Sequence, residues 1–134
     1  MMIGISLSPC ALRAAGPSVP AAAYAAYAAA CVVPPTPTRA LAFKAMFDAL
    51  WSAGLYDRIS NLTAFCADTA QAARINLKDP SRVAIEVNAM THTPGFGYSG
   101  DEVSGHIDFG ESFAHSGHLT LNSATLWAFC NQQN

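Results

Sequence analysis

Three prolines within four positions, at residues 34–37, constrain the fold of this chain more than any other feature. A proline inside a helix removes a backbone hydrogen bond and clashes with the preceding turn, so this segment ends any helix that reaches it. The alanine-rich run before it is predicted to form a helix from Pro20 to about Cys31, followed by a stiff extended linker. We therefore expect an arm, a helix and a linker in residues 1–37 and the main domain in residues 38–134.

A second helix is predicted directly after the linker. Thr38 is placed to cap its first turn, and Gly54 is a natural stop. Between them, apolar residues recur with the spacing of one helix face, namely Phe43, Met46, Phe47, Leu50 and Trp51. We expect the last three of these side chains to be buried against the strands that follow.

Beyond this helix the pattern changes to that of β-strands. Apolar and polar residues alternate in three short segments, residues 83–88, 106–110 and 119–122. Glycine-rich turn material at residues 94–101 separates the first two. Helices followed by a run of antiparallel strands are typical of an α+β fold.

The N-terminal arm, residues 2–13, also has a strand pattern. Ile3, Ile5 and Leu7 alternate with glycine and serine, as in a half-buried strand. A strand that pairs with nothing leaves its backbone polar groups to water and its apolar side chains exposed. We therefore expect these three residues to form an interface by adding to the sheet edge of a neighbouring subunit.

The low charge of the chain limits its possible partners. Only 12% of the residues are charged, about half the share found in ordinary soluble domains. Such a surface is poorly solvated, so we expect a homo-oligomer or a chain covered by other proteins. The net charge of −2 argues against nucleic acid as a partner, because few cations are present to replace phosphate counterions. No apolar run is long enough to span a bilayer, so no membrane partner is expected.

The four cysteines do not form a recognisable motif. No two of them have the spacing of a metal knuckle, and no C-x-x-C occurs. Cys10, Cys31, Cys66 and Cys130 are expected to be small, mostly buried thiols of a protein that matures in a reducing cytosol. We expect no cofactor.

Residues that often bind metals cluster in one place. They are His106, Asp108, Glu111, His115 and His118. On a strand the first two share a face, and the spacing of the two later histidines allows both to reach one ion. However, glycine and serine surround them, as in exposed turns, and no helical H-E-x-x-H is present. We expect a solvated loop and keep His106, Asp108, His115 and His118 as weak metal candidates.

Other catalytic motifs are missing from the sequence. There is no G-x-S-x-G, and no glycine-rich phosphate loop precedes a helix. The carboxylate pairs, such as Asp101 with Glu102, lie in predicted surface turns. We therefore expect the chain not to be an enzyme.

Several short motifs follow one another in the middle of the chain. Leu-Tyr-Asp-Arg-Ile at 55–59 and Phe-Cys-Ala-Asp at 65–68 precede Gln-Ala-Ala-Arg-Ile-Asn-Leu at 71–77. Then come Val-Asn-Ala-Met-Thr-His-Thr at 87–93, Gly-Tyr-Ser-Gly-Asp at 97–101 and Ile-Asp-Phe-Gly at 107–110. In their order and spacing, over roughly residues 20–113, they resemble a block found in tailed-phage and prophage structural proteins.

The resemblance carries its own expectations about fold and function. In that family the block leads into a concanavalin-like (laminin-G-like) jelly roll, so it implies that the strands form a partial, jelly-roll-like sandwich. The chain looks like a shortened or truncated member. The resemblance implies a structural virion protein in the head, tail or fibre, assembled in the host cytoplasm with other virion proteins as partners. It supplies no catalytic residues.

Two other functions stay open. A carbohydrate-binding host-attachment module of a fibre or spike would bind a host surface glycan through exposed aromatic side chains. The candidates are Phe96, Tyr98, Phe109 and Trp127. A metal-dependent hydrolase would use the cluster between His106 and His118.

Overall fold

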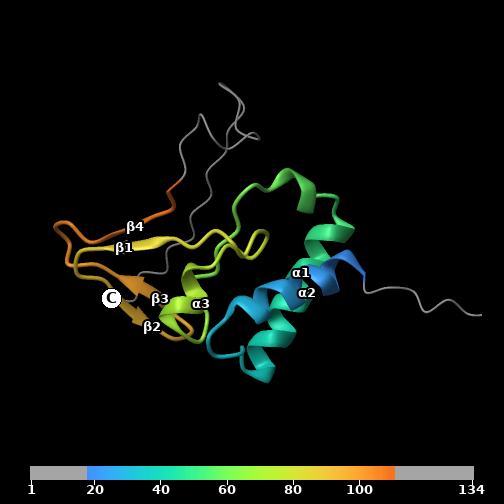
Figure 1. Cartoon of the computed structure of the whole chain (residues 1–134), viewed down its shortest axis with the longest axis horizontal. Helices are drawn as coiled ribbons and strands as arrows, with labels where there is room; N and C mark the ends of the chain where they lie inside the picture. Colours follow the sequence, from blue (N-terminus) through green and yellow to red (C-terminus); the bar gives the residue numbers. More distant parts are fainter. Residues whose placement is uncertain (1–17, 111–134) are drawn as a thin grey trace, which may run out of the picture.

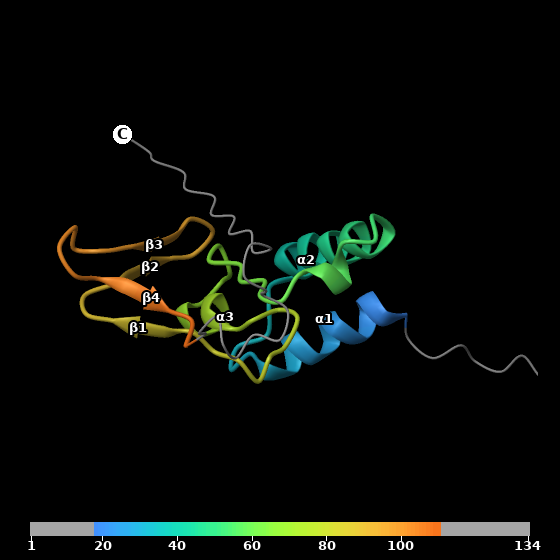
Figure 2. The same ribbon diagram turned by 90° about the horizontal axis from the view of Figure 1, so that it is seen from above.

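A computed structural model of the chain describes residues 18–110. Its helical elements are α1 (Val19–Ala30), α2 (Pro37–Ser52), the 3₁₀ helix η1 (Tyr56–Arg58) and α3 (Ala70–Arg74). Its strands are β1 (Ile85–Val87), β2 (Thr91–Thr93), β3 (Gly97–Ser99) and β4 (His106–Asp108). The helical pair lies at one end, the strands lie at the other, and α3 lies between them (Figures 1 and 2). The predicted order of helices before antiparallel strands is confirmed.

The first helix follows the predicted boundaries closely. Pro20 lies in its first turn, where a missing N–H costs nothing, and Ser18 is the N-cap residue. The helix ends where Cys31 becomes extended, with φ −73° and ψ 129°. None of the helices within residues 18–110 is both long enough and apolar enough to cross a membrane.

The cap of the second helix lies two residues before the predicted one. The prediction of Thr38 as the cap is wrong, because Thr36 is the N-cap and its hydroxyl accepts a hydrogen bond from the N–H of Arg39 (3.4 Å). Pro37 is the first helical residue, a position that suits its fixed φ. The predicted stop at Gly54 is confirmed, since this residue adopts φ +66° directly after the helix.

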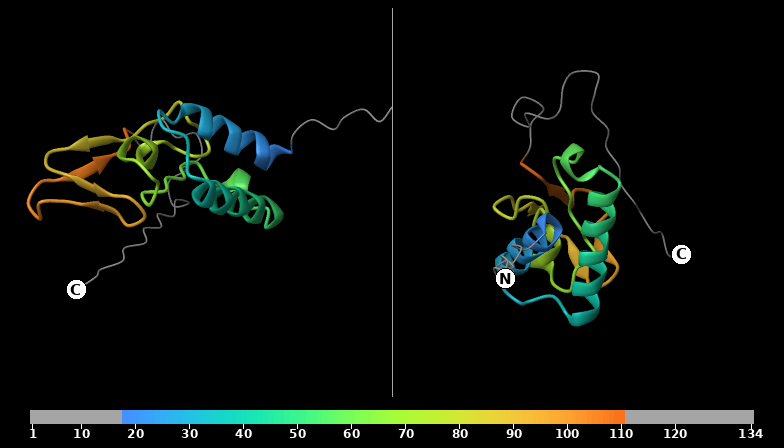
Figure 3. Two further views of the ribbon diagram at one scale, coloured as in Figure 1. Left: turned by 90° about the horizontal axis from the view of Figure 1, so that it is seen from below. Right: turned by 90° about the vertical axis from the view of Figure 1, so that its right-hand side faces the viewer.

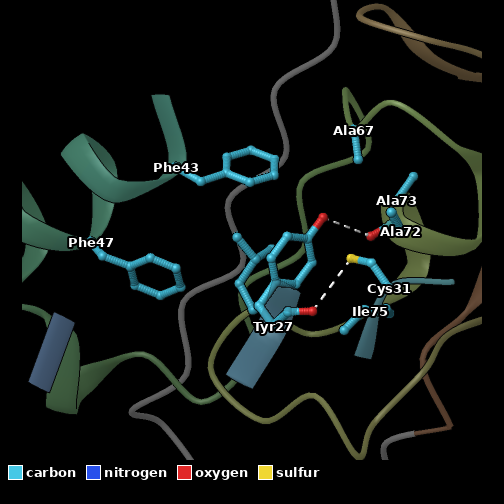
Figure 4. Close-up of a cluster of buried hydrophobic side chains, with 9 residues drawn as sticks. Tyr27, Cys31, Phe43, Phe47, Ala67, Ala72, Ala73 and Ile75 are labelled. Carbon is cyan, nitrogen blue, oxygen red and sulfur yellow. Dashed lines mark hydrogen bonds between the residues drawn. The ribbon is translucent and has the colours of Figure 1, made fainter. Parts of the chain in front are cut away.

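The core lies between the two helices and residues 67–77 (Figure 4). Tyr27 and Phe47 are completely buried, and the ring of Tyr27 meets that of Phe43 edge to face, with 5.4 Å between centroids. The Tyr27 hydroxyl donates a hydrogen bond to the carbonyl of Ala72 (3.3 Å), and burial raises the pKa of this phenol. This pairing joins α1 to α3.

The prediction for the apolar face of α2 is only partly right. Phe43 and Phe47 are buried, but Leu50 is half-buried and Trp51 is 43% exposed. The reason is that this face packs on α1 rather than on the strands. The α1 helix covers the middle of the face and leaves its C-terminal end open.

The strands form two separate two-stranded antiparallel sheets, β1 with β4 and β2 with β3. A tight turn joins β2 to β3. In it Pro94 is followed by Gly95 at φ +82°, and the N–H of Phe96 donates a hydrogen bond to the carbonyl of Thr93 (3.0 Å). This is a type II turn, which requires glycine at its third position. Residues 18–110 form no closed or jelly-roll sandwich.

The buried and exposed positions around β1 are the reverse of those expected from the hydrophobicity of the residues. Ala84 is buried, whereas Val83 and Ile85 are exposed. On the side of the strand that Ala84 shares, Glu86 is half-buried and pairs with Arg74 of α3. A charged pair on the inner side therefore turns the larger apolar side chains outward.

Candidate functional site

The connection between α1 and α2 is held by a carboxylate from a distant part of the chain. Asp68 Oδ2 accepts hydrogen bonds from the N–H (2.8 Å) and the hydroxyl (3.0 Å) of Thr36. Its Oδ1 lies 3.5 Å from Nε of Arg39. Burial tends to raise the pKa of Asp68, but the bonds from Thr36 and the Arg39 guanidinium outweigh it and hold the pKa below its ordinary value.

The other end of this connection is held in the same manner by Gln71. Its Oε1 accepts the N–H of Val32 (3.1 Å), and its Nε2 donates to the carbonyl of Ala30 (3.0 Å). Between these anchors, the side chains of Val32 and Val33 are 81% and 54% exposed. Residues 32–35, which we call the presented segment, are thus apolar and fixed at both ends, and all of them except the half-buried Pro35 are exposed.

A second polar cluster joins α3 to the strands. Glu86 of β1 lies 3.2 Å from Nε of Arg74 and within hydrogen-bond distance of the Tyr98 hydroxyl. That hydroxyl also lies 2.8 Å from the carbonyl of Ala70. Burial, and then the hydrogen bond and charge of Glu86, raise the pKa of Tyr98 to about 12. The phenol is therefore neutral at physiological pH and acts as a donor within the fold.

Asn76 organises the chain that follows α3. Its side chain is 2% exposed, and Oδ1 accepts the backbone N–H groups of Leu62 (3.3 Å), Lys78 (2.9 Å) and Asp79 (3.4 Å). One amide oxygen thus fixes two segments of irregular backbone. Sequence analysis placed this asparagine in a motif but gave it no role, because its three partners are backbone groups.

Asp101 plays a similar part in the loop between β3 and β4. Its Oδ1 accepts the N–H groups of Val103 (3.1 Å), Ser104 (2.8 Å) and Gly105 (2.7 Å), and these bonds lower its pKa. Gly105 approaches the chain so closely that a Cβ there would lie 2.8 Å from the carbonyl oxygen of Ala89. The loop is therefore a tight, internally bonded structure.

The predicted metal candidates are only partly within the described residues. His106 and Asp108 lie on one face of β4 and are both exposed. His106 Nδ1 lies 2.9 Å from the carbonyl of Ser104, and Asp108 accepts the N–H of Gly110 (2.8 Å). Within residues 18–110, no three His, Cys, Asp or Glu side chains are placed to hold an ion. The remaining candidates, Glu111, His115 and His118, lie outside the described residues.

Two of the predicted glycan-binding aromatics, Tyr98 and Phe109, both lie against the ring of Phe65. Phe96 lies in the β2–β3 turn and is 71% exposed. Tyr98 is half-buried, and Phe109 is exposed but stacks on Phe65, with 6.1 Å between ring centroids. Trp127 lies outside the described residues, as do the predicted interface residues of the arm, Ile3, Ile5 and Leu7.

A second exposed apolar region lies at the C-terminal end of α2. A hollow of about 310 Å³ is lined by Trp51, Gly54, Tyr56 and Asp57. The ring of Tyr56 meets that of Trp51 edge to face at 5.8 Å. Lys78 holds Tyr56 in place, since its Nζ bonds to the Tyr56 carbonyl (2.7 Å) and lies 4.9 Å from the ring centroid. Sequence analysis missed this hollow because the periodic pattern predicted a buried tryptophan.

Comparison of the chain with family models, with curated proteins and with solved structures gave no match.

Proposed function

We propose that this chain is a structural virion protein of a tailed bacteriophage or phage-like particle that acts by docking on other proteins. The observation that carries the proposal is the presented segment. Val32 and Val33 remain exposed although Gln71 and Asp68 fix the backbone on either side of them. An apolar segment that is both exposed and rigid loses little entropy on binding, which suits a permanent protein contact.

The use of the polar side chains supports a role without catalysis. Asp68, Gln71, Asn76 and Asp101 all bind backbone groups of the same chain. A general acid or base must instead be placed to reach a substrate. The residues on which the resemblance to phage structural proteins rests therefore serve the fold and its presented surface.

We further propose that the two small sheets belong to a larger jelly-roll-like sandwich that is completed in the particle. Each strand of a two-stranded sheet has one edge that is not paired within that sheet, and such edges readily accept another strand. The outward side chains of Val83 and Ile85 provide apolar surface beside one of these edges. On this proposal the protein is located in the virion, after assembly in the host cytoplasm.

Inactivation of the gene in a strain that produces the particles tests this function. We expect assembly to stop at a defined intermediate, visible by negative-stain electron microscopy, and to resume when the wild-type gene is supplied. Normal yields of complete, infectious particles without the protein would contradict the proposal.

A glycan-binding role in host attachment is the second candidate, favoured by the exposed Phe96 and Phe109 rings. It makes a different prediction for the same strain. Particles would assemble in normal numbers but would fail to adsorb to cells, and the Phe96→Ala and Phe109→Ala variants would share that defect. A defect in assembly with normal adsorption of any finished particles favours the docking role.

A further inference from the structure

The β1–β4 sheet has one edge that lacks a partner in the described part of the chain. Within residues 18–110, β4 pairs with β1 and with no other strand. The chain that enters β1 is already held, since Val83 forms a bridge with Ile75 and the N–H of Ala84 donates to the carbonyl of Arg74 (2.9 Å). A two-stranded sheet is only marginally stable by itself, so a further strand beside β4 would stabilise this one.

We propose that residues 119–122 of the same chain form this third strand, antiparallel to β4 and on its free edge. The proposal names one strand of the larger sandwich proposed above and rests on that part of the proposed function. It does not depend on the virion role, because it is tested in purified protein. Its failure would therefore leave the particle experiment unaffected.

The chain turns directly after β4. Oδ1 of Asp108 accepts the N–H of Gly110 (2.8 Å), which makes an Asx turn, and Gly110 itself has φ +62°. The strand β4 runs from the far end of the strands back towards α3 (Figures 2 and 3). A turn at this point directs the following residues away from α3 and back along the edge of β4.

The length of the connection fits an antiparallel neighbour. Residues 109–118 join the end of β4 to residue 119, and this stretch contains glycine and serine at positions 110, 112, 116 and 117, as loops often do. A parallel neighbour needs a crossover of about a dozen residues or more, usually with a helix, whereas antiparallel strands need only a loop. The chain therefore reaches the free edge of β4 most simply as a hairpin.

The apolar face of β4 looks towards the second sheet. Ile107 is the register partner of Glu86, so the two side chains share a face, and Glu86 lies within hydrogen-bond distance of the hydroxyl of Tyr98 in β3. Phe109 continues this face, since its ring stacks on that of Phe65 with 6.1 Å between centroids. The ring of Phe65 also meets that of Tyr98. Apolar side chains added beside Ile107 and Phe109 would therefore extend the layer between the two sheets.

The alternation of residues 119–122 matches that of β4. Opposite residues of an antiparallel pair have their side chains on the same face. With Leu119 and Leu121 on the inner face, they lie beside Ile107 and cover Phe109, which is 41% exposed. The polar residues of both strands then share the outer face, namely His106, Asp108, Thr120 and Asn122. A slip of one residue would turn both leucines outward, so this register is the favoured one.

A second copy of the chain is the other source of the same strand. Exchange of a strand between copies preserves every contact that the strand makes within one copy. However, a short connection holds residues 119–122 near their own β4 at an effective concentration of about 1 mM or more. The strand from the same chain is therefore favoured in dilute protein.

NMR spectroscopy of the full-length chain tests the contact directly. We expect nuclear Overhauser effects between residues 106–109 and residues 119–122, and slow hydrogen exchange of the amides in the second segment. Both should persist on dilution, and in a mixture of labelled and unlabelled copies the effects should remain within the labelled copy. Absence of these effects, or their occurrence between copies, would overturn the proposal.

A pair of double variants tests which face the leucines occupy. Leu119→Asp combined with Leu121→Asp should lower Tm by about 5 °C or more and abolish the slow exchange, because two charges enter the layer between the sheets. The matched control, Thr120→Asp combined with Asn122→Asp, adds the same charge on the outer face and should keep the wild-type Tm and slow exchange. A leucine variant that behaves like the wild type, or an equal loss in the control, would contradict the assigned face.

Discussion

Individual polar side chains in the middle of this chain replace regular secondary structure. Between α2 and β1 the regular structure is limited to η1, the five-residue α3 and two isolated β-bridges, so many backbone N–H and carbonyl groups need other partners. Asn76 supplies its side-chain oxygen to three of these N–H groups. Asp68 does the same for Thr36 in the α1–α2 connection, and Asp101 for the β3–β4 loop, and each accepts more than one bond. Such residues attract attention as catalytic candidates in a sequence, and here their oxygen atoms bind the backbone of the same chain.

The Tyr98 hydroxyl gives a direct test at this scale. Tyr98→Phe should lower the free energy of unfolding by about 1–2 kcal/mol, because the part-buried hydroxyl that donates to the Glu86 carboxylate or the Ala70 carbonyl is lost. Urea denaturation followed by circular dichroism measures the change. Tyr24→Phe is the control, since no hydrogen bond joins the Tyr24 hydroxyl to another residue in the described part of the chain. An equal cost in both variants would contradict the role assigned to Tyr98.

The lowered pKa of Asp68 predicts how its contribution to stability changes with pH. Its pKa in the folded state lies below the ordinary value of about 3.9, so its contribution is present above that value and is lost as the pH falls through the folded pKa. Asp68→Asn should therefore cost about 1–2 kcal/mol at pH 7 and progressively less below pH 4. Unfolding curves from pH 7 to pH 2.5 provide the measurement. A cost that does not change over this range would contradict the ionic role of Asp68. The pKa of Asp101 is also lowered, so some acid sensitivity should remain in the variant.

At the scale of elements, patterns with a local cause were predictable and those set by neighbours were not. Proline and glycine act through their own backbone, so the ends of α1 and α2 were found to within two residues. The faces of elements depend on what packs against them. Trp51 was therefore placed wrongly, since α1 covers only part of α2. The periodicity likewise did not show that Ile85 is exposed while Glu86 pairs with Arg74. The hollow near Trp51 depends on that uncovered end and had no signal in the periodicity.

The two aromatic residues of α2 should differ strongly in their effect on stability. Phe47→Ala should cost about 3–5 kcal/mol, because the ring is completely buried and its loss leaves a cavity. Trp51→Ala should cost only about 1–2 kcal/mol, since the indole is 43% exposed. Thermal and urea unfolding of both variants checks the difference. Equal costs would mean that the end of α2 is covered in solution by another part of the chain.

At the scale of the whole molecule, a low charge and two separate apolar surfaces favour assembly over an independent existence. The charged share of 12% leaves little to keep copies apart, and the exposed apolar residues occur at both ends of the helical pair and on the strands. These features agree with our proposal that the chain is one part of a larger particle.

The N-terminal arm belongs to this scale. Deletion of residues 1–13 should leave the helical pair and strands folded but abolish incorporation into particles, since Ile3, Ile5 and Leu7 are expected to add to a neighbour's sheet edge. Circular dichroism of the shortened chain and immunoblots of purified particles provide the two measurements. Normal incorporation of the folded, shortened protein would contradict the docking role of the arm.

The central claim is that this chain is a structural part of a virion, and quantitative mass spectrometry of gradient-purified particles tests it most directly. The account predicts that peptides of the chain occur in a fixed ratio to the other particle proteins and that the ratio persists through repeated gradients and high salt. Particles that lack the chain, with the protein remaining free in the lysate as a monomer, would contradict it.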